Sequence, residues 1–165
     1  MRLDMIPEEA RDNIREKVER FLCEEKGYAR EDLELGQVVE VVLGEKRVAP
    51  VLDIVIRLRD KRLIAIKCAP GSVVSREMEV LSMARLLDSY QIPFSVATNG
   101  EEGELLDTVT GKVIGKGLEA IPSKAQALEW LEAGDFKPLP EKKVEQAKRV
   151  LLASDVVKCS VVCEY

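Results

Sequence analysis

The stretch that decides the fold is LDIVIRLRDKRLIAIKCAP, residues 52–70. Two apolar runs, residues 51–58 and residues 63–68, meet there at the polar link RDKR, residues 59–62. Runs rich in isoleucine, leucine and valine predict strands, and so short a link predicts an antiparallel hairpin. The second run is nearly continuous, which is typical of a strand covered on both faces.

Two charged residues, Asp53 and Lys67, lie inside these apolar runs. An aspartate within an apolar strand is unfavourable unless it has a partner or binds a metal. A carboxylate and a lysine on paired strands are groups that a metal-dependent phosphodiesterase uses, but neither run holds a second carboxylate. The alternative is that Asp53 lies at an edge with its carboxylate in water and that Lys67 extends to the sheet margin.

The rest of the chain predicts further helices and strands around this hairpin. Helical spacing and capping signals predict helices, and short apolar runs predict strands. Turn-linked strands are antiparallel neighbours, and a helix between two strands allows a parallel crossover. The expected helices are 7–26, 74–89, 123–132 and 141–153, the expected strands are 35–43, 51–58, 63–68, 94–98, 104–106 and 112–114, and 156–162 is a last strand or a packed apolar tail. The order predicts an α/β (α+β) fold, a mixed sheet with helices on both faces.

Composition limits the function. The chain has 165 residues, 46 % of them hydrophobic and 33 % charged, as in an ordinary soluble domain. Its net charge of −5 counts against tight autonomous DNA binding, because phosphate contacts need cations, although a local basic patch stays open. The absence of histidine excludes serine–histidine triads, cysteine–histidine pairs and imidazole metal sites.

Four cysteines lack zinc-ribbon spacing, so we expect reduced thiols. No apolar run approaches the roughly 20 residues that cross a bilayer. The N-terminal segment is too short and too acidic for a signal peptide. We therefore expect a cytoplasmic protein with no membrane partner.

Four segments carry a resemblance to a known family: LDIVI at 52–56, KCAPGS at 67–72, SREMEVLSMARLL at 75–87 and IPFSVATNGEEGELLDT at 92–108. They resemble the N-terminal domain of type I restriction enzyme restriction subunits and, more narrowly, small free-standing microbial proteins related to it. The resemblance implies a PD-(D/E)XK nuclease-like fold with the core order αβββαβ. It predicts a restriction-endonuclease-like core over residues 1–122 and a helical extension over 123–165, packed on the same domain.

In that family an aspartate on the second strand and a Glu-x-Lys on the third converge on a divalent cation. Asp53 matches the aspartate. The third strand of the family reads Glu-x-Lys-Ala-Pro, and alignment on Ala69-Pro70 puts Ile66 in the place of the glutamate and Cys68 in the place of the lysine. A shift by one residue makes Lys67 the lysine and Ala65 the replacement for the glutamate. Because alternate strand residues face opposite sides, the two registers place Lys67 on opposite faces.

A carboxylate from elsewhere is needed to rebuild such a site. Glu77 and Glu79, on the helix after the third strand, are the first candidates, and Glu16 and Glu40 are others. The resulting hypothesis is a Mg²⁺- or Mn²⁺-dependent DNA phosphodiesterase with a degenerate or remodelled site. Its catalytic residues are Asp53, Lys67 and Glu79, its metal ligands Asp53, Glu77 and Glu79, and its nucleic-acid contacts Arg57, Arg59 and Arg76.

The alternative hypothesis is a non-catalytic module that binds nucleic acid or protein and has retained the nuclease fold. The acidic net charge and the missing Glu-x-Lys favour it. DNA or a partner protein is the expected partner, and a homo-oligomer stays open.

Overall fold

The computed structural model describes residues 8–162, with side chains described over residues 9–154. Its centre is a six-stranded sheet with the strand order β1-β4-β5-β6-β7-β8. The strands are β1 (Leu33–Val38), β4 (Val51–Leu58), β5 (Lys61–Cys68), β6 (Phe94–Thr98), β7 (Gly103–Asp107) and β8 (Val113–Lys116). Only β5 and β6 are parallel, and every other pair is antiparallel. The predicted mixed α/β fold is confirmed.

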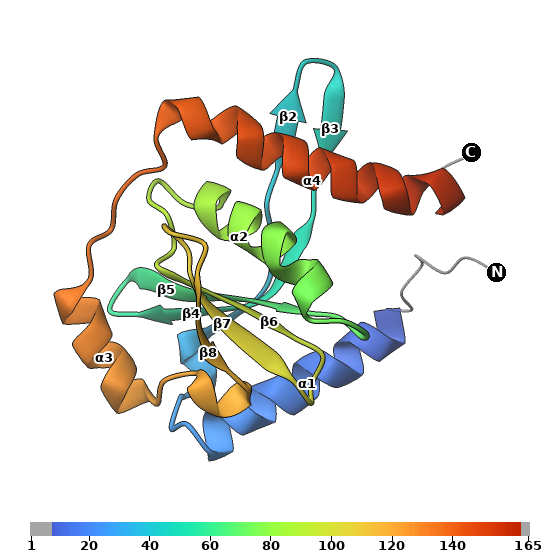
Figure 1. Cartoon of the computed structure of the whole chain (residues 1–165). Helices are drawn as coiled ribbons and strands as arrows, with labels where there is room; N and C mark the ends of the chain where they lie inside the picture. The colour runs from blue at the N-terminus through green and yellow to red at the C-terminus, as the bar shows by residue number, and fades with distance from the viewer. Residues whose placement is uncertain (1–7, 163–165) are drawn as a thin grey trace.

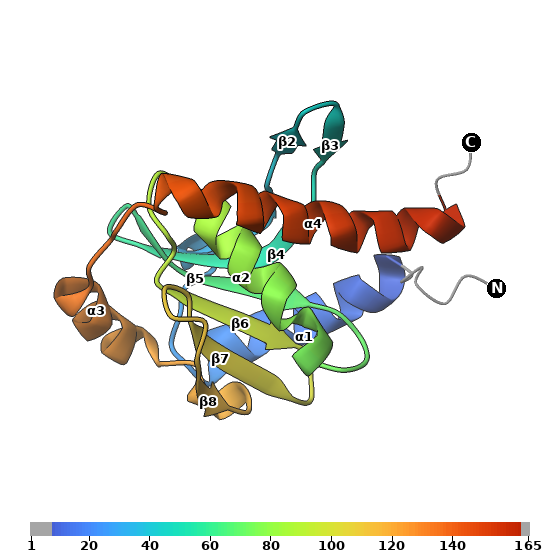
Figure 2. The same ribbon diagram turned by 45° about the horizontal axis from the view of Figure 1, so that its top comes forward.

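Helices cover both faces of the sheet. The helices are α1 (Glu8–Glu24), α2 (Glu77–Leu86), α3 (Lys124–Ala133) and α4 (Glu141–Val162). Helix α2 makes the crossover between the parallel strands β5 and β6, and α4 packs across α2. Figures 1 and 2 show α2 and α4 on one side of the sheet and α1 on the other. No helix within residues 8–162 is long and apolar enough to cross a membrane.

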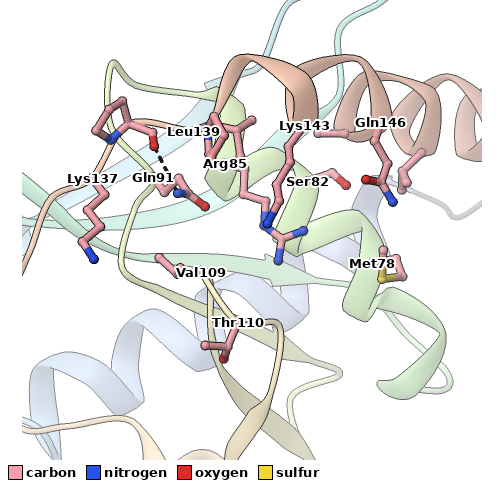
Figure 3. Close-up of a pocket in the computed structure, with 14 residues that line it drawn as sticks. Met78, Ser82, Arg85, Gln91, Val109, Thr110, Lys137, Leu139, Lys143 and Gln146 are labelled. Atoms are coloured by element: carbon pink, nitrogen blue, oxygen red, sulfur yellow. Dashed lines mark hydrogen bonds between the residues drawn. The ribbon is translucent and has the colours of Figure 1, made fainter.

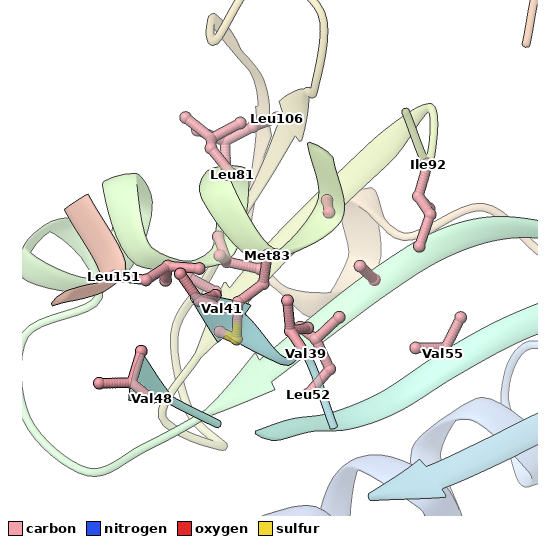
Figure 4. Packing of buried hydrophobic residues seen from close by; sticks show 14 of the residues in the cluster. Val39, Val41, Val48, Leu52, Val55, Leu81, Met83, Ile92, Leu106 and Leu151 are labelled. Carbon is pink, nitrogen blue, oxygen red and sulfur yellow. The ribbon is translucent and has the colours of Figure 1, made fainter. Parts of the chain in front are cut away.

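Side chains from successive positions of the central strands enter two separate cores. Val55 on β4 and Ala65 on β5 pack with α2, whereas Ile54 and Ile66 pack with α1 and α3. All four are fully buried. Figure 4 shows the α2 core, in which Met83 from α2 and Leu151 from α4 meet residues of the sheet. Burial on both faces explains why the central strands read as continuous apolar runs.

The predicted single strand at 35–43 is wrong, because the chain leaves the sheet after β1. The N–H of Val39 donates to the carbonyl of Pro50 at 2.8 Å, and the chain then forms a separate ribbon of β2 (Val41–Leu43) and β3 (Lys46–Val48). Gly44 turns this hairpin at φ +64°, a conformation that favours glycine. Val41 and Val48 are buried in the core that α4 covers. The valine-rich segment predicted as one strand is therefore divided between β1 of the large sheet and β2 of the small one.

The predicted strand at 156–162 is also wrong, since α4 continues as a helix to Val162. No glycine or proline separates this segment from the helix before it, and valine lowers helix propensity only slightly, so the helix propagates. The alternative prediction was an apolar tail that packs on the core. It concerns side chains outside the described ones. Cys159 and Cys163 fall there too, while Cys23 and Cys68 are free thiols.

Candidate functional site

Asp53 and Lys67 face each other on the α2 side of the sheet. Ile54 pairs with Ile66, so Asp53 lies opposite Lys67, and the Lys67 Nζ is 3.8 Å from the Asp53 Oδ2. The face that Lys67 occupies is also that of Ala65, whereas Ile66 points to the other core. Lys67 therefore shares a sheet face with Ala65 and Asp53, which is the arrangement that the register shifted by one residue requires.

A β-bulge produces this register. At the hairpin end Leu58 pairs with Lys61 and Arg57 with Arg62, and an irregularity between Ile56 and Arg57 then shifts the pairing. If the pairing at the hairpin end continued along both strands without this shift, Asp53 would lie opposite Ile66. One extra residue in a strand moves every later side chain to the other face of the sheet. The bulge thus brings Lys67 to the same side as Asp53.

The buried pair is held by backbone hydrogen bonds. The backbone N–H of Cys68 donates to the Asp53 Oδ2 at 2.7 Å, and the Lys67 ammonium donates to the carbonyl of Val51 at 3.0 Å. Asp53 is 7 % exposed and Lys67 is 5 % exposed. Burial raises the pKa of the neighbouring Cys68 thiol, so that thiol stays protonated and is a weak nucleophile.

Glu79 comes from the helix that covers this face. It lies in the first turn of α2, four residues before the fully buried Met83, and is itself 5 % exposed. Residues four apart share one side of a helix, so the Glu79 side chain is on the sheet-facing side of α2. Arg76 lies 3.9 Å from it as an ion-pair partner. Glu79 is thus a buried carboxylate on the helix that covers the sheet face of Asp53 and Lys67.

Glu104 is a charged residue of this face that the sequence interpretation missed. Lys67 pairs with Ala97 and Ala97 with Glu104, so the row across β5, β6 and β7 continues to another buried carboxyl group. Burial raises its pKa, and a hydrogen bond and the charge of Glu77 raise it further. An acid inside an apolar strand, the signal that marked Asp53, was present here as well.

The Glu104→Gln variant is expected to be more stable than the wild-type protein near neutral pH. A raised carboxyl pKa means that the folded state binds the proton more tightly than the unfolded chain, so ionisation destabilises the fold. This penalty exists above the raised pKa and disappears as the pH falls from there towards the ordinary value of 4.5. Urea unfolding of both proteins across this range measures it, with the exposed Glu129→Gln as a control. A pH-independent difference would contradict the assignment.

The arginines predicted to contact nucleic acid divide into two places. Arg57 pairs with Asp60 at 3.1 Å and Arg59 with Glu132 at 3.3 Å, both at the hairpin end of β4 and β5. Arg59 is six residues from Asp53 along the chain, which is about 20 Å in a strand. Arg76, at the start of α2, is the predicted arginine that lies beside a candidate site carboxylate, that of Glu79.

Of the other candidate acids, two are exposed and one reaches the end of the buried row. Glu40 is exposed between β1 and β2, and Glu16 is exposed on α1. Glu77 is half-buried and interacts with Glu104. Over the side chains that the structure describes, no three histidine, cysteine, aspartate or glutamate residues are grouped closely enough to hold a metal ion.

The six-stranded sheet and the helices on its two faces define a mixed α/β protein. The family model for the type I restriction enzyme R protein N terminus matches residues 7–122, and the chain belongs to this family. The helices α3 and α4 lie beyond the matched residues.

A solved structure agrees with this fold. It is a fragment assigned as an HsdR subunit of a type I restriction enzyme from Vibrio vulnificus YJ016, with 16 % sequence identity and a TM-score of 0.55. The match covers 91 % of this chain and 32 % of that fragment, so this chain spans about a third of that relative. At this identity the likeness shows the fold alone. A comparison with curated protein sequences gives no match.

Proposed function

We propose that this protein is a Mg²⁺-dependent DNA phosphodiesterase with a remodelled site formed by Asp53, Lys67 and Glu79. The observation that carries the proposal is the Asp53–Lys67 pair, 3.8 Å apart on one sheet face, under a helix that adds the buried carboxylate of Glu79. DNA is proposed as the substrate because the chain belongs to the family of type I restriction enzyme R protein N termini.

Glu79 supplies the carboxylate that β5 lacks. In the register shifted by one residue, Ala65 takes the position of the family's glutamate, so we place the ligand on another element that covers the same face. Buried charged side chains are unfavourable unless they are compensated, and Asp53, Lys67, Glu79 and Glu104 are all at most 7 % exposed. A core that keeps so many charges is better explained by chemistry than by stability.

The donor set suits a hydrated magnesium ion. Mg²⁺ takes one or two protein carboxylates and completes its shell with water and substrate phosphate oxygens, so Asp53 and Glu79 are the residues that would hold it. Bound there, the ion would polarise the phosphate and lower the pKa of a water molecule. Lys67, with its Nζ 3.8 Å from the Asp53 Oδ2, would orient the attacking water, and the Cys68 N–H holds the Asp53 carboxylate.

The second candidate function is a non-catalytic module that binds nucleic acid or protein. It is favoured by the lack of any three-residue metal group among the described side chains, and by the contacts that the Asp53 Oδ2 already makes with Cys68 and Lys67. In this alternative the charged row is a remnant that ties β4 to β5.

Cleavage of plasmid, linear and single-stranded DNA in the presence of Mg²⁺ or Mn²⁺ tests the first proposal. Asp53→Asn and Glu79→Gln are each expected to lower the cleavage rate by about 100-fold or more, as removal of one preorganised group does elsewhere. Glu129→Gln, an exposed acid on α3, is the matched control and should cleave like the wild-type protein. A wild-type protein that cleaves none of these DNAs, or an Asp53→Asn variant that still cleaves, would refute the enzyme.

Calorimetric titration with Mg²⁺ and Mn²⁺ separates the two candidates without an activity assay. Binding that is lost in Asp53→Asn, while the variant keeps a cooperative unfolding transition, supports the metal site. A folded wild-type protein that binds neither ion supports the non-catalytic module.

A further inference from the structure

A pocket lies on the far side of α2 from the strand row, between α2 and α4. It has a volume of about 330 Å³ and is closed by the turn after β7 and by the connector before α4 (Figure 3). Helix α2 belongs to the residues that the family model matches, whereas α4 follows them. The pocket therefore exists because the C-terminal helix packs on the core.

The charged residues that line this pocket are all cations. They are Arg85, Lys137 and Lys143, and the lining holds no aspartate or glutamate although the chain has a net charge of −5. Figure 3 shows the guanidinium of Arg85 and the ammonium of Lys143 both directed to the middle of the pocket. Lys137 points away and pairs with Asp135 at 3.4 Å. The pocket thus presents two converging positive charges.

Arg85 is fixed in place without a carboxylate. Its Nε donates to the carbonyl of Thr108 at 2.9 Å, and the described residues give it no ion-pair partner. Its half-buried position lowers its pKa, and the charge of Asp107 partly offsets this effect. Asp107 itself accepts hydrogen bonds from the N–H groups of Val109 and Thr110. The terminal nitrogens of Arg85 are therefore aligned for an anion that this part of the chain does not supply.

Ser82 gives an independent sign of a ligand. Its side chain is 1 % exposed and lines the pocket, yet its hydroxyl has no hydrogen-bond partner in the described structure. Buried hydroxyl groups nearly always have such a partner, so a buried one without it calls for an explanation. The hydroxyl itself is covered in the ligand-free structure, so an acceptor oxygen of a bound molecule would provide the missing bond only after the pocket wall shifts slightly.

We propose that this pocket binds a small molecule through a phosphate monoester group. A phosphate monoester carries a charge of about −1.5 to −2 at neutral pH, which two cations neutralise and one carboxylate would not match. Guanidinium groups bind phosphate with two parallel hydrogen bonds, and lysine adds a point charge. Met78, Leu139 and Val150 form apolar walls for the remainder of the ligand. The volume is at the small end of ligand sites, which run from about 300 to 1,000 Å³.

Isothermal calorimetry of the full chain tests the proposal, with adenosine 5′-monophosphate and inorganic phosphate as probes. Lys143→Gln and Arg85→Gln are each expected to weaken binding of the nucleotide by about 10-fold or more, since each removes a charged hydrogen bond. Lys137→Gln is the matched control, because Lys137 points away from the pocket, and it should change binding less than about two-fold. Lys143→Gln stays decisive if Arg85→Gln fails to fold, since the exposed Lys143 side chain makes no ion pair within the described residues.

The Ser82→Ala variant distinguishes a serine that contacts the ligand from one that only supports the fold. It should weaken nucleotide binding and raise the thermal midpoint of the ligand-free protein, because it removes an unsatisfied buried hydroxyl. Failure of both probes to bind, or binding that Lys143→Gln leaves unchanged, would overturn the proposal. Binding of a 5′-phosphorylated oligonucleotide but of neither probe would overturn it too. Asp53→Asn should bind the nucleotide normally, which separates this site from the proposed nuclease site.

Discussion

Ile66→Glu is expected to destabilise the protein by more than about 4 kcal/mol, close to complete loss of the fold. The substitution introduces a glutamate at the position that alignment on Ala69-Pro70 assigns to the glutamate of the family's Glu-x-Lys. Ile66, however, is fully buried in the core beneath α1 and α3, on the face opposite to Asp53. The variant loses the buried isoleucine side chain and places a carboxylate among apolar neighbours such as Ile54 and Val96.

Ala65→Glu is the matched variant, since it adds the same carboxylate one residue earlier, on the face of Lys67. Enlarging a buried alanine typically costs about 1–3 kcal/mol, and the ammonium two residues away on the same side offsets part of the charge. Ile66→Val measures the loss of apolar volume alone, about 1 kcal/mol. Urea unfolding of the three variants gives their free energies. An Ile66→Glu protein as stable as Ala65→Glu would mean that the register of β5 is wrong.

This contrast shows what the sequence reveals and what it hides. The strands Val51–Leu58 and Phe94–Thr98 were predicted with the bounds that the structure has, because proline or polar residues limit each apolar run. Asp53 and Lys67 were identifiable because a charge inside such a run is unfavourable. Their common face was not, because it depends on a bulge between Ile56 and Arg57 that no residue pattern announces.

Long-range contacts account for the rest. Glu77 and Glu104 lie on α2 and β7, and only the packing of the helix on the sheet brings their carboxyl groups together. The pocket at Ser82 needs α4 to fold back over α2, and local spacing says nothing of that contact. Helix and strand propensities are local, so a site assembled from distant elements is visible only in the fold.

Lys67→Met is expected to destabilise the fold by about 3–5 kcal/mol, because it leaves the Asp53 carboxylate buried without its cation. Methionine preserves most of the lysine stem, so lost packing contributes little. The carbonyl of Val51 also loses a donor at 3.0 Å. Urea unfolding measures the cost, and a change below about 1 kcal/mol would mean that the pair is solvated, as a surface ion pair is.

The double variant Asp53→Asn/Lys67→Met is expected to recover most of that stability. The asparagine side-chain oxygen still accepts the Cys68 N–H, and neither β4 nor β5 keeps one charge of the Asp53–Lys67 pair without the other. Replacing a buried ion pair by neutral groups is often neutral or stabilising, so a pair kept for stability alone would be replaceable. If the pair serves the chemistry proposed for it, the double variant folds well but neither binds Mg²⁺ nor cleaves DNA. A stable double variant that still binds Mg²⁺ would show that the metal is held without Asp53 and Lys67.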